Sequence, residues 1–267
     1  ASYSETVARQ TFKELTPILQ QEYLGGPVFI GNPELQMSAL KNYDLRCDVK
    51  TEGGGLVSVS WFHKDVSDPI EYVQRLAAFD FTTPVNYPRG ELSGYEFEVR
   101  QDLKRFGRRL EGFTLGANAT FIDSEVHLPD DEIAAFSDPS IAVPTTSRDM
   151  TNAPEHLYNV YLTWDGPKSG LQLALFYTVQ GDTLVAGAGE AVGNYVPDVY
   201  AKEYDTLNFS ATQKLGDVFK LQFQAKNLTN PRIEEVYRGD TIGDDVTKTS
   251  YTKGIEYSIA LTAQWSF

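Results

Sequence analysis

Few residues of this 267-residue chain have the types and spacing that covalent chemistry requires. There are three histidines, His63, His127 and His156, and one cysteine, Cys47. A hydrolase needs a nucleophile held beside a base, and no G-x-S-x-G turn that would present a serine occurs in the sequence. We therefore predict no catalytic residues and no enzyme activity, while an enzyme built on a small barrel stays open as an alternative.

Metal and cofactor motifs are also weak. Carboxylates gather at 130–132 and at 240–245, and hard cations such as Ca²⁺ prefer carboxylate oxygens, but neither run has the spacing of an EF-hand loop. The glycines at 187, 189 and 193 imitate a dinucleotide-binding turn with the wrong third spacing and no following helix. The sequence defines no metal site, leaves a metal in the acidic segments open, and predicts no cofactor.

The charge balance limits the partners. Lys plus Arg is 23 and Asp plus Glu is 37, giving a net charge of −14. Nucleic-acid binding requires a basic surface, so we expect no nucleic-acid partner. Aromatic residues make up 12% of the chain, too many for a disordered acidic segment. No run of about 18 apolar residues and no signal peptide is found, so we expect a mature protein or part of a longer one.

The elements that would position any site have a period of two. In the last segment, apolar residues alternate with small or polar ones such as Ser258 and Thr262. The apolar members are Tyr257, Ile259, Leu261, Ala263, Trp265 and Phe267. Similar alternation predicts ten strands, at about 1–8, 40–51, 55–66, 90–103, 110–124, 153–165, 169–182, 200–214, 218–228 and 254–267.

The predicted strands and their connections favour one fold class. Strands of this length exceed the five or six residues typical of globular sheets and suit tilted strands that cross a bilayer. Short connections alternate with long ones, and the long connections span 9–39, 67–89, 125–152, 183–199 and 229–253. We predict an all-β, antiparallel transmembrane β-barrel sheet of about ten long strands. A soluble β-sandwich is disfavoured, because its strands are shorter and its loops do not alternate in length.

Several segments resemble the C-terminal part of the barrel of TonB-dependent outer-membrane receptors. The resemblance rests on their order and spacing, and one departure is Gln10, where the family usually has proline. The segments are Ser2–Arg9 with Phe12, Glu14, Leu15 and Pro17; Gly31–Leu35 with Asn42–Leu45; Trp61–Asp65 with Pro69 and Ile70; Gly94–Glu98; Ala225–Pro231; and Tyr251, Gly254, Tyr257 and Phe267.

The resemblance implies a 22-stranded barrel of which residues 1–267 form one domain or segment, with neither plug domain nor signal peptide in this sequence. It implies import of a scarce nutrient, a carbohydrate or a metal chelate, across the outer membrane of a Gram-negative bacterium. Implied partners are outer-membrane lipid, the small-molecule nutrient, the N-terminal barrel and plug of the same receptor or a partner chain, and an inner-membrane energy-coupling complex acting through the plug.

Other arrangements stay open. The chain is alternatively an independent ten-stranded outer-membrane barrel that acts as an enzyme or passive pore, or a half barrel completed by another chain. An open membrane sheet would leave unpaired strand edges in lipid. The first and last strands are therefore expected to pair with each other or with protein outside this sequence.

Two groups of site residues follow. Tyr257, Ile259, Leu261, Trp265 and Phe267 resemble the assembly signal that outer-membrane barrels carry on the last strand. Candidate ligand-contacting residues in the long loops are Arg232, Tyr237, Arg238, Asp240 and Tyr195. The acidic loops favour sugars, neutral chelates or cationic ligands over anionic ferric siderophores. The segment from Gly31 to Leu45 most resembles receptors linked to carbohydrate uptake.

Overall fold

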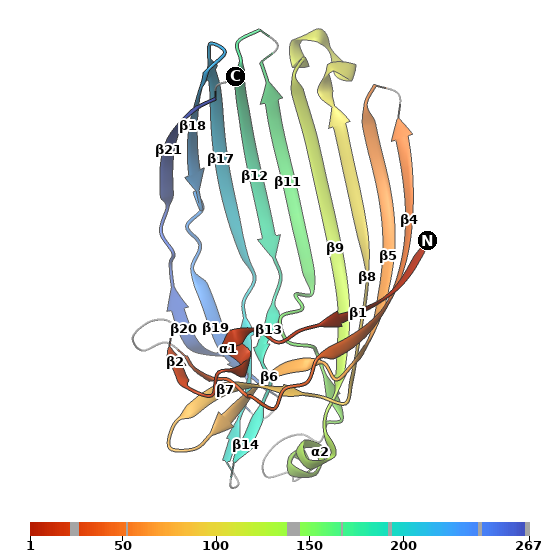
Figure 1. Ribbon diagram of the computed structural model, residues 1–267, viewed down its shortest axis with the longest axis vertical. Helices are drawn as coiled ribbons and strands as arrows, with labels where there is room; N and C mark the ends of the chain where they lie inside the picture. Colours follow the sequence, from red (N-terminus) through yellow and green to blue (C-terminus); the bar gives the residue numbers. More distant parts are fainter. Residues whose placement is uncertain are drawn as a thin grey trace.

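Ten long antiparallel strands form the body of the protein (Figure 1). The computed structural model describes residues 1–21, 27–51, 53–137, 145–166, 168–191, 194–239 and 242–264. In sheet order the strands are β1 (Ser2–Ala8), β4 (Ser38–Thr51), β5 (Gly55–Ser67), β8 (Arg89–Asp102), β9 (Phe113–His127), β11 (His156–Asp165), β12 (Leu171–Gln180), β17 (Tyr204–Leu215), β18 (Phe219–Lys226) and β21 (Glu256–Ala263). The predicted all-β class and its strand meander are confirmed.

The alternation in the sequence gives the sheet one apolar and one polar face. On the apolar face Leu45, Val59 and Phe97 are 55%, 44% and 45% exposed. Strand register aligns these side chains, since Val59 pairs with Cys47 on one side and Phe97 on the other. A broad apolar surface of this kind is stable only against lipid or another apolar surface.

The polar face is connected by hydrogen bonds between strands. Arg46 donates to Asp48 at 2.8 Å, to Glu98 at 2.9 Å and to Ser58 at 3.0 Å. Further along, the amide of Asn159 donates to Asn118 at 2.8 Å. Because Arg46, Asp48 and Glu98 pair with one another across the strands, this face suits a water-filled lumen.

Two glycines on the polar face let aromatic rings lie flat on the neighbouring strand. A Cβ at Gly116 would be 2.1 Å from the ring of Tyr161, and one at Gly94 would be 2.5 Å from the ring of Phe62. In both pairs the glycine and the aromatic residue face each other in the strand register. These contacts compensate for the side chain that glycine lacks.

Short turns join the strands at one end of the sheet, which lies at the top of Figure 1. Gly53 and Gly54 in the first turn have φ of +84° and +80°, a conformation that glycine adopts without strain. The second turn contains two 3-10 helices, η1 (Leu103–Phe106) and η2 (Arg108–Leu110). The long connections all lie at the opposite end, as the alternation of loop lengths predicted.

These long connections carry secondary structure of their own, and we call the whole the outer cap: the described residues of 9–37, 68–88, 128–155, 181–203 and 227–255. It contains three small sheets, ordered β2-β3-β7-β6, β13-β16-β19-β20 and β14-β15. Its elements are α1 (Phe12–Leu15), β2 (Leu19–Gln21), β3 (Val28–Ile30), β6 (Ile70–Leu76), β7 (Asp80–Asn86), α2 (Asp130–Phe136), β10 (Ser147–Arg148), β13 (Thr183–Ala186), β14 (Gly189–Ala191), β15 (Asn194–Val196), β16 (Asp198–Ala201), β19 (Ile233–Arg238) and β20 (Val246–Tyr251).

The main sheet is open within the described residues. β1 pairs only with β4 along the sheet and β21 only with β18, and the two lie at opposite sides of the molecule (Figure 1). A barrel closed on itself would need β1 to pair with β21, and the described strands do not show this pairing. Helices in the described part of the chain are too short to cross a membrane.

Candidate functional site

The outer cap has a packed apolar core. Val73, Tyr87 and Val126 are at most 1% exposed, and Phe136 is 2% exposed. Leu128 and Ala188 complete the cluster, with Met150 and Ile133 packed against it. The core joins the connections that follow β5, β9 and β12. The cap is therefore a folded unit that holds its surface residues in place.

Strand β6 lies at the centre of this unit. Glu71, Val73 and Gln74 are at most 1% exposed, so the strand is buried on both faces. Its backbone is bound by Gly187, which accepts from the amide of Gln74 at 2.8 Å and donates to the carbonyl of Tyr72 at 2.7 Å. A Cβ at Gly189 would be 1.9 Å from the carbonyl oxygen of Gln74, so only glycine permits this approach.

A chain of polar side chains crosses the cap core. Glu132 on α2 accepts from Arg75 at 2.8 Å and also from the hydroxyl of Tyr87. That hydroxyl in turn accepts from Arg148 at 2.6 Å, and the guanidinium of Arg148 lies 5.0 Å from the centre of the Tyr87 ring. Burial raises the pKa of Tyr87 well above its usual range, so the phenol stays neutral.

Glu71 is the buried carboxyl whose ionisation is most altered. Burial raises its pKa from 4.5 to about 7, although the backbone N–H of Thr151 donates to it at 2.8 Å. A hydrogen bond to the carboxylate lowers the pKa, but desolvation outweighs it here. The cap therefore holds a proton on Glu71 in a pH range where the unfolded segment would release it.

This shift predicts that the cap becomes less stable as pH rises. Between about pH 4.5 and 7 the folded cap binds more protons at Glu71 than the open cap, so the free energy of opening falls by about 3 kcal/mol. Hydrogen exchange of residues 70–76, corrected for intrinsic rates, should show this decrease. Glu71→Gln keeps an acceptor for Thr151 and should remove the pH dependence; the same slope in the variant would contradict the assignment.

A second network ties the connection that follows β12 to the connection that follows β18. Arg238 donates to Asp182 at 2.7 Å and to Asp245 at 2.9 Å, and Lys202 reaches the same two carboxylates at 3.2 and 3.4 Å. The guanidinium of Arg238 lies 4.5 Å from the centre of the Tyr200 ring. Arg238 lowers the pKa of Asp245 to about 2. Arg238, a predicted ligand residue, is thus engaged inside the cap.

The other predicted loop residues are dispersed. Arg232 is 72% exposed and lies 3.7 Å from Glu234. Tyr237 lies under the ammonium of Lys248 at 5.1 Å, and burial raises the pKa of its phenol. Tyr195 is in β15 opposite Glu190 in the backbone register. Asp240 lies outside the described residues.

A cavity of about 590 Å³ opens within the cap. Four connections supply its lining: Lys13, Leu19, Gln20, Gln21, Pro27, Val28, Phe29, Tyr72, Thr82, Val185, Glu235 and Tyr251. Lys13 lies 4.9 Å from the centre of the Phe29 ring, which packs edge-on against Tyr72 at 5.5 Å. Aromatic rings, amides and a few charges around a hollow of this size form a typical small-molecule site.

Sequence reasoning missed this lining, since Lys13, Gln20 and Phe29 are in a segment treated as a simple loop. One local signal was available. Thr11 and Glu14 form a capping box, with the Thr11 N–H donating to Glu14 at 2.6 Å and the Glu14 N–H donating to Thr11 at 3.2 Å. The T-x-x-E pattern predicts such a helix start, and Tyr72 then donates to Glu14 at 2.9 Å.

The remaining candidate groups have ordinary contacts. His156 lies 2.9 Å from Glu203, and His63 lies 3.5 Å from Asp65. No group of three or more His, Cys, Asp or Glu that could hold a metal is found in the part of the chain that the structure describes. Cys47 is exposed on the apolar face.

The predicted assembly signal is in part described. Tyr257, Ile259 and Leu261 project from β21 on the apolar face and are 62%, 75% and 64% exposed. Trp265 and Phe267 lie outside the described residues. The described residues of the predicted signal therefore form an apolar row on a strand with one unpaired edge.

An antiparallel meander with an apolar outer face, short turns at one end and a structured cap at the other defines a segment of a transmembrane β-barrel. The chain belongs to the family described as TonB dependent receptor-like, beta-barrel, whose profile matches residues 1–228. The resemblance seen in the sequence is thereby confirmed. This is a family of transport receptors and not of enzymes.

Solved structures show the same fold. A ferric enterobactin receptor from Pseudomonas aeruginosa, in complex with enterobactin, superposes with a TM-score of 0.58 at 15% identity over 98% of this chain. The siderophore receptor PirA from the same organism superposes with a TM-score of 0.51 at 14% identity over 98% of this chain. The FrpB iron transporter from Neisseria meningitidis superposes with a TM-score of 0.52 at 11% identity over 88% of this chain. The chain covers 37%, 38% and 32% of these proteins. No curated protein matches its sequence.

Proposed function

We propose that residues 1–267 are a C-terminal barrel segment of a TonB-dependent receptor in the outer membrane of a Gram-negative bacterium, where the receptor imports a scarce nutrient. The observation that carries the proposal is the cavity of about 590 Å³ in the cap above a membrane sheet. Four separate connections converge on it, which a loop cluster without a binding role does not require. The segment has no catalytic role in this proposal.

The open sheet supports the proposed partners. β1 and β21 each leave one edge unpaired in the described chain, and such edges are not viable in lipid. We therefore infer that the N-terminal strands of the same receptor, or a partner chain, pair with these edges and close the barrel. The plug would lie against the polar face and transmit force from the inner-membrane energy-coupling complex.

The cavity lining favours an uncharged or weakly charged ligand. Lys13 and Glu235 contribute one charge of each sign, while Gln20, Tyr72 and Tyr251 offer amide and hydroxyl groups beside aromatic surface. Rings that stack and amides that donate and accept suit a carbohydrate or a neutral metal chelate. A strongly anionic ferric catecholate would need several cations, and the lining has one lysine.

Binding to the full receptor tests the proposal. The probes are neutral oligosaccharides, cobalamin, a neutral ferric hydroxamate and an anionic ferric catecholate. For whichever probe the wild-type receptor binds, Tyr251→Ala should lower the affinity by about tenfold, since an aromatic contact in the cavity is lost. The matched control is Tyr257→Ala, a tyrosine on the apolar face. If the receptor bound only the ferric catecholate, the proposed ligand class would be wrong. If both variants lost affinity equally, the cavity would not be the binding site.

A further inference from the structure

A row of four side chains crosses the sheet β2-β3-β7-β6 at the cavity of the cap. Gln20 pairs in register with Phe29, and Phe29 pairs with Thr82. Thr82 then pairs with Gln74 on β6. Paired residues of neighbouring strands project to the same face of a sheet. The first three residues line the cavity, so the row ends with Gln74 directly behind the cavity wall.

Gln74 is the buried end of this row and is 1% exposed. Its amide nitrogen donates to the hydroxyl of Thr82 at 3.0 Å, while its amide oxygen is buried without a hydrogen-bond partner. An unpaired buried oxygen costs free energy of folding, and an apolar side chain of the same size would avoid that cost. A glutamine at this position is therefore explained better by a functional role than by folding.

The hydrogen bond from Gln74 fixes how the Thr82 hydroxyl can act. A hydroxyl carries one proton to donate and accepts through its lone pairs. Because Gln74 donates to the hydroxyl oxygen, the Thr82 proton must point away from Gln74, and no group among the described residues accepts it. Thr82 is half-buried at the cavity surface, so its proton is available to an acceptor inside the cavity.

Gln20, at the other end of the row, presents the complementary group. Its amide nitrogen donates to the carbonyl oxygens of Lys13 at 3.1 Å and Thr16 at 3.3 Å. These bonds hold the nitrogen end of the amide, which leaves its oxygen to accept from a ligand. Two strand spacings, about 10 Å, separate Gln20 from Thr82. The row therefore offers an acceptor and a donor on either side of Phe29.

We propose that Gln20 and Thr82 bind hydroxyl groups of a neutral oligosaccharide, and that Gln74 is a positioning residue that directs the Thr82 proton toward it. A sugar hydroxyl both donates and accepts, so one oligosaccharide satisfies both groups. The ligating oxygens of a metal chelate are bound to the metal and carry no proton for Gln20. This inference rests on the proposed function, because it concerns the same cavity, and it narrows the ligand to a carbohydrate.

Calorimetric titration of the full receptor with neutral hexasaccharides of glucose, xylose, mannose and galactose tests the inference. For whichever hexasaccharide the wild type binds, Thr82→Val should lower the affinity by about tenfold, and Thr82→Ser, which keeps the hydroxyl, by less than about twofold. Gln20→Met removes the acceptor at the other end of the row and should lower the affinity by about fivefold.

Gln74→Met tests the positioning role. It should lower the affinity by about threefold in the wild-type receptor and cause no further loss in the Thr82→Val receptor, because Gln74 acts through the Thr82 hydroxyl. Hydrogen exchange of residues 70–76 should stay as slow as in the wild type, since the unpaired oxygen is removed together with the hydrogen bond. A purely structural glutamine would instead give faster exchange.

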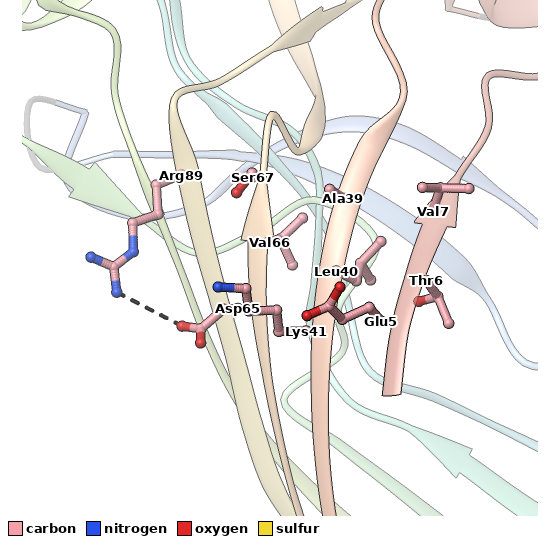
Figure 2. A pocket seen from close by; sticks show the side chains of 10 residues that line it. All are labelled: Glu5, Thr6, Val7, Ala39, Leu40, Lys41, Asp65, Val66, Ser67 and Arg89. Atoms are coloured by element: carbon pink, nitrogen blue, oxygen red, sulfur yellow. Dashed lines mark ion pairs between the residues drawn. The ribbon is translucent and has the colours of Figure 1, made fainter. Parts of the chain in front are cut away.

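Thr6→Val is the matched control. Thr6 on β1 (Figure 2) also accepts from a buried amide on the neighbouring strand, that of Asn42 at 3.0 Å. This threonine is in the main sheet and does not line the cap cavity. Its replacement should therefore leave the affinity for the hexasaccharide unchanged.

Several results would overturn the inference. They are wild-type affinity in either Thr82→Val or Gln20→Met, a loss in Thr6→Val as large as in Thr82→Val, and an equal effect of Gln74→Met with and without the Thr82 hydroxyl. Binding of a neutral chelate but of no hexasaccharide would also reject it. Tyr251→Ala separates this inference from the proposed function. A loss in Tyr251→Ala with none in Thr82→Val rejects only the roles assigned to the row, whereas no loss in either variant rejects the cavity itself.

Discussion

Leu162→Arg should destabilise the barrel by about 2–4 kcal/mol, whereas Thr163→Arg, one residue further along β11, should change its stability by less than about 1 kcal/mol. Leu162 is on the apolar face, paired with Leu115 and Leu175. It lies between Tyr158 and Trp164, within the apolar band. An arginine there must enter hydrocarbon or distort the bilayer. Thr163 faces the lumen, where water solvates the same side chain.

Reversible urea unfolding of the full receptor in lipid vesicles measures the two free energies. The adjacent positions share the strand, the register and the added charge, so only the face differs. Equal destabilisation by both substitutions would contradict the assignment of the apolar face to lipid. Destabilisation by Thr163→Arg alone would mean that the lipid-facing and lumen-facing sides of the sheet are assigned the wrong way round.

The main sheet was predictable because lipid on one face and water on the other impose a strict alternation. The predicted strands at 55–66 and 90–103 correspond to β5 at Gly55–Ser67 and β8 at Arg89–Asp102. Their ends agree within about one residue: β5 begins directly after the turn at Gly53 and Gly54, and β8 ends where Asp102 caps the following 3-10 helix. In β12 the alternation is blurred by Phe176, which packs 5.9 Å from Tyr161 on the polar face.

The outer cap was not predictable in the same way. β6 is buried on both faces, so Glu71 and Gln74 are enclosed although their types are typical of exposed positions. Their burial depends on contacts with Gly187 and Thr151, more than 70 residues away. The local sequence pattern carries no information about contacts between residues so far apart in the chain. The segments 67–89 and 183–199 therefore gave no signal beyond their length.

The same reason explains why the predicted ligand-contacting residues differ from those that line the cavity. Arg238 has the type and exposed setting that suggest a ligand contact, yet Asp182 and Asp245 bind its guanidinium. Lys13 and Tyr251 line the cavity because two connections, more than 200 residues apart, meet there. Loop lengths predicted that ligand contacts lie at the loop end, and the candidate cavity is found there. The particular side chains depend on how the loops fold together.

Glu132→Leu should destabilise the cap by about 2–3 kcal/mol, with little effect on the strands in the membrane. The Glu132 side chain is 10% exposed and binds Arg75 at 2.8 Å and the hydroxyl of Tyr87. Without the carboxylate, the Tyr87 hydroxyl loses the acceptor for its proton, and Arg75 keeps only the carbonyl of Gln74 at 3.3 Å. The Arg75 side chain is 31% exposed, so water partly solvates its guanidinium. The expected loss of stability is therefore smaller than for a fully buried ion pair.

Limited proteolysis and hydrogen exchange of residues 128–137 and 145–152 measure this effect. Asp131→Leu is the matched control, because it removes a carboxylate from the exposed side of the same helix. Arg75→Met combined with Glu132→Leu should recover part of the lost stability, since a buried ion pair replaced on both sides leaves no isolated charge. If the double variant is no more stable than Glu132→Leu, the carboxylate acts mainly through Tyr87 and Arg148 and not through Arg75.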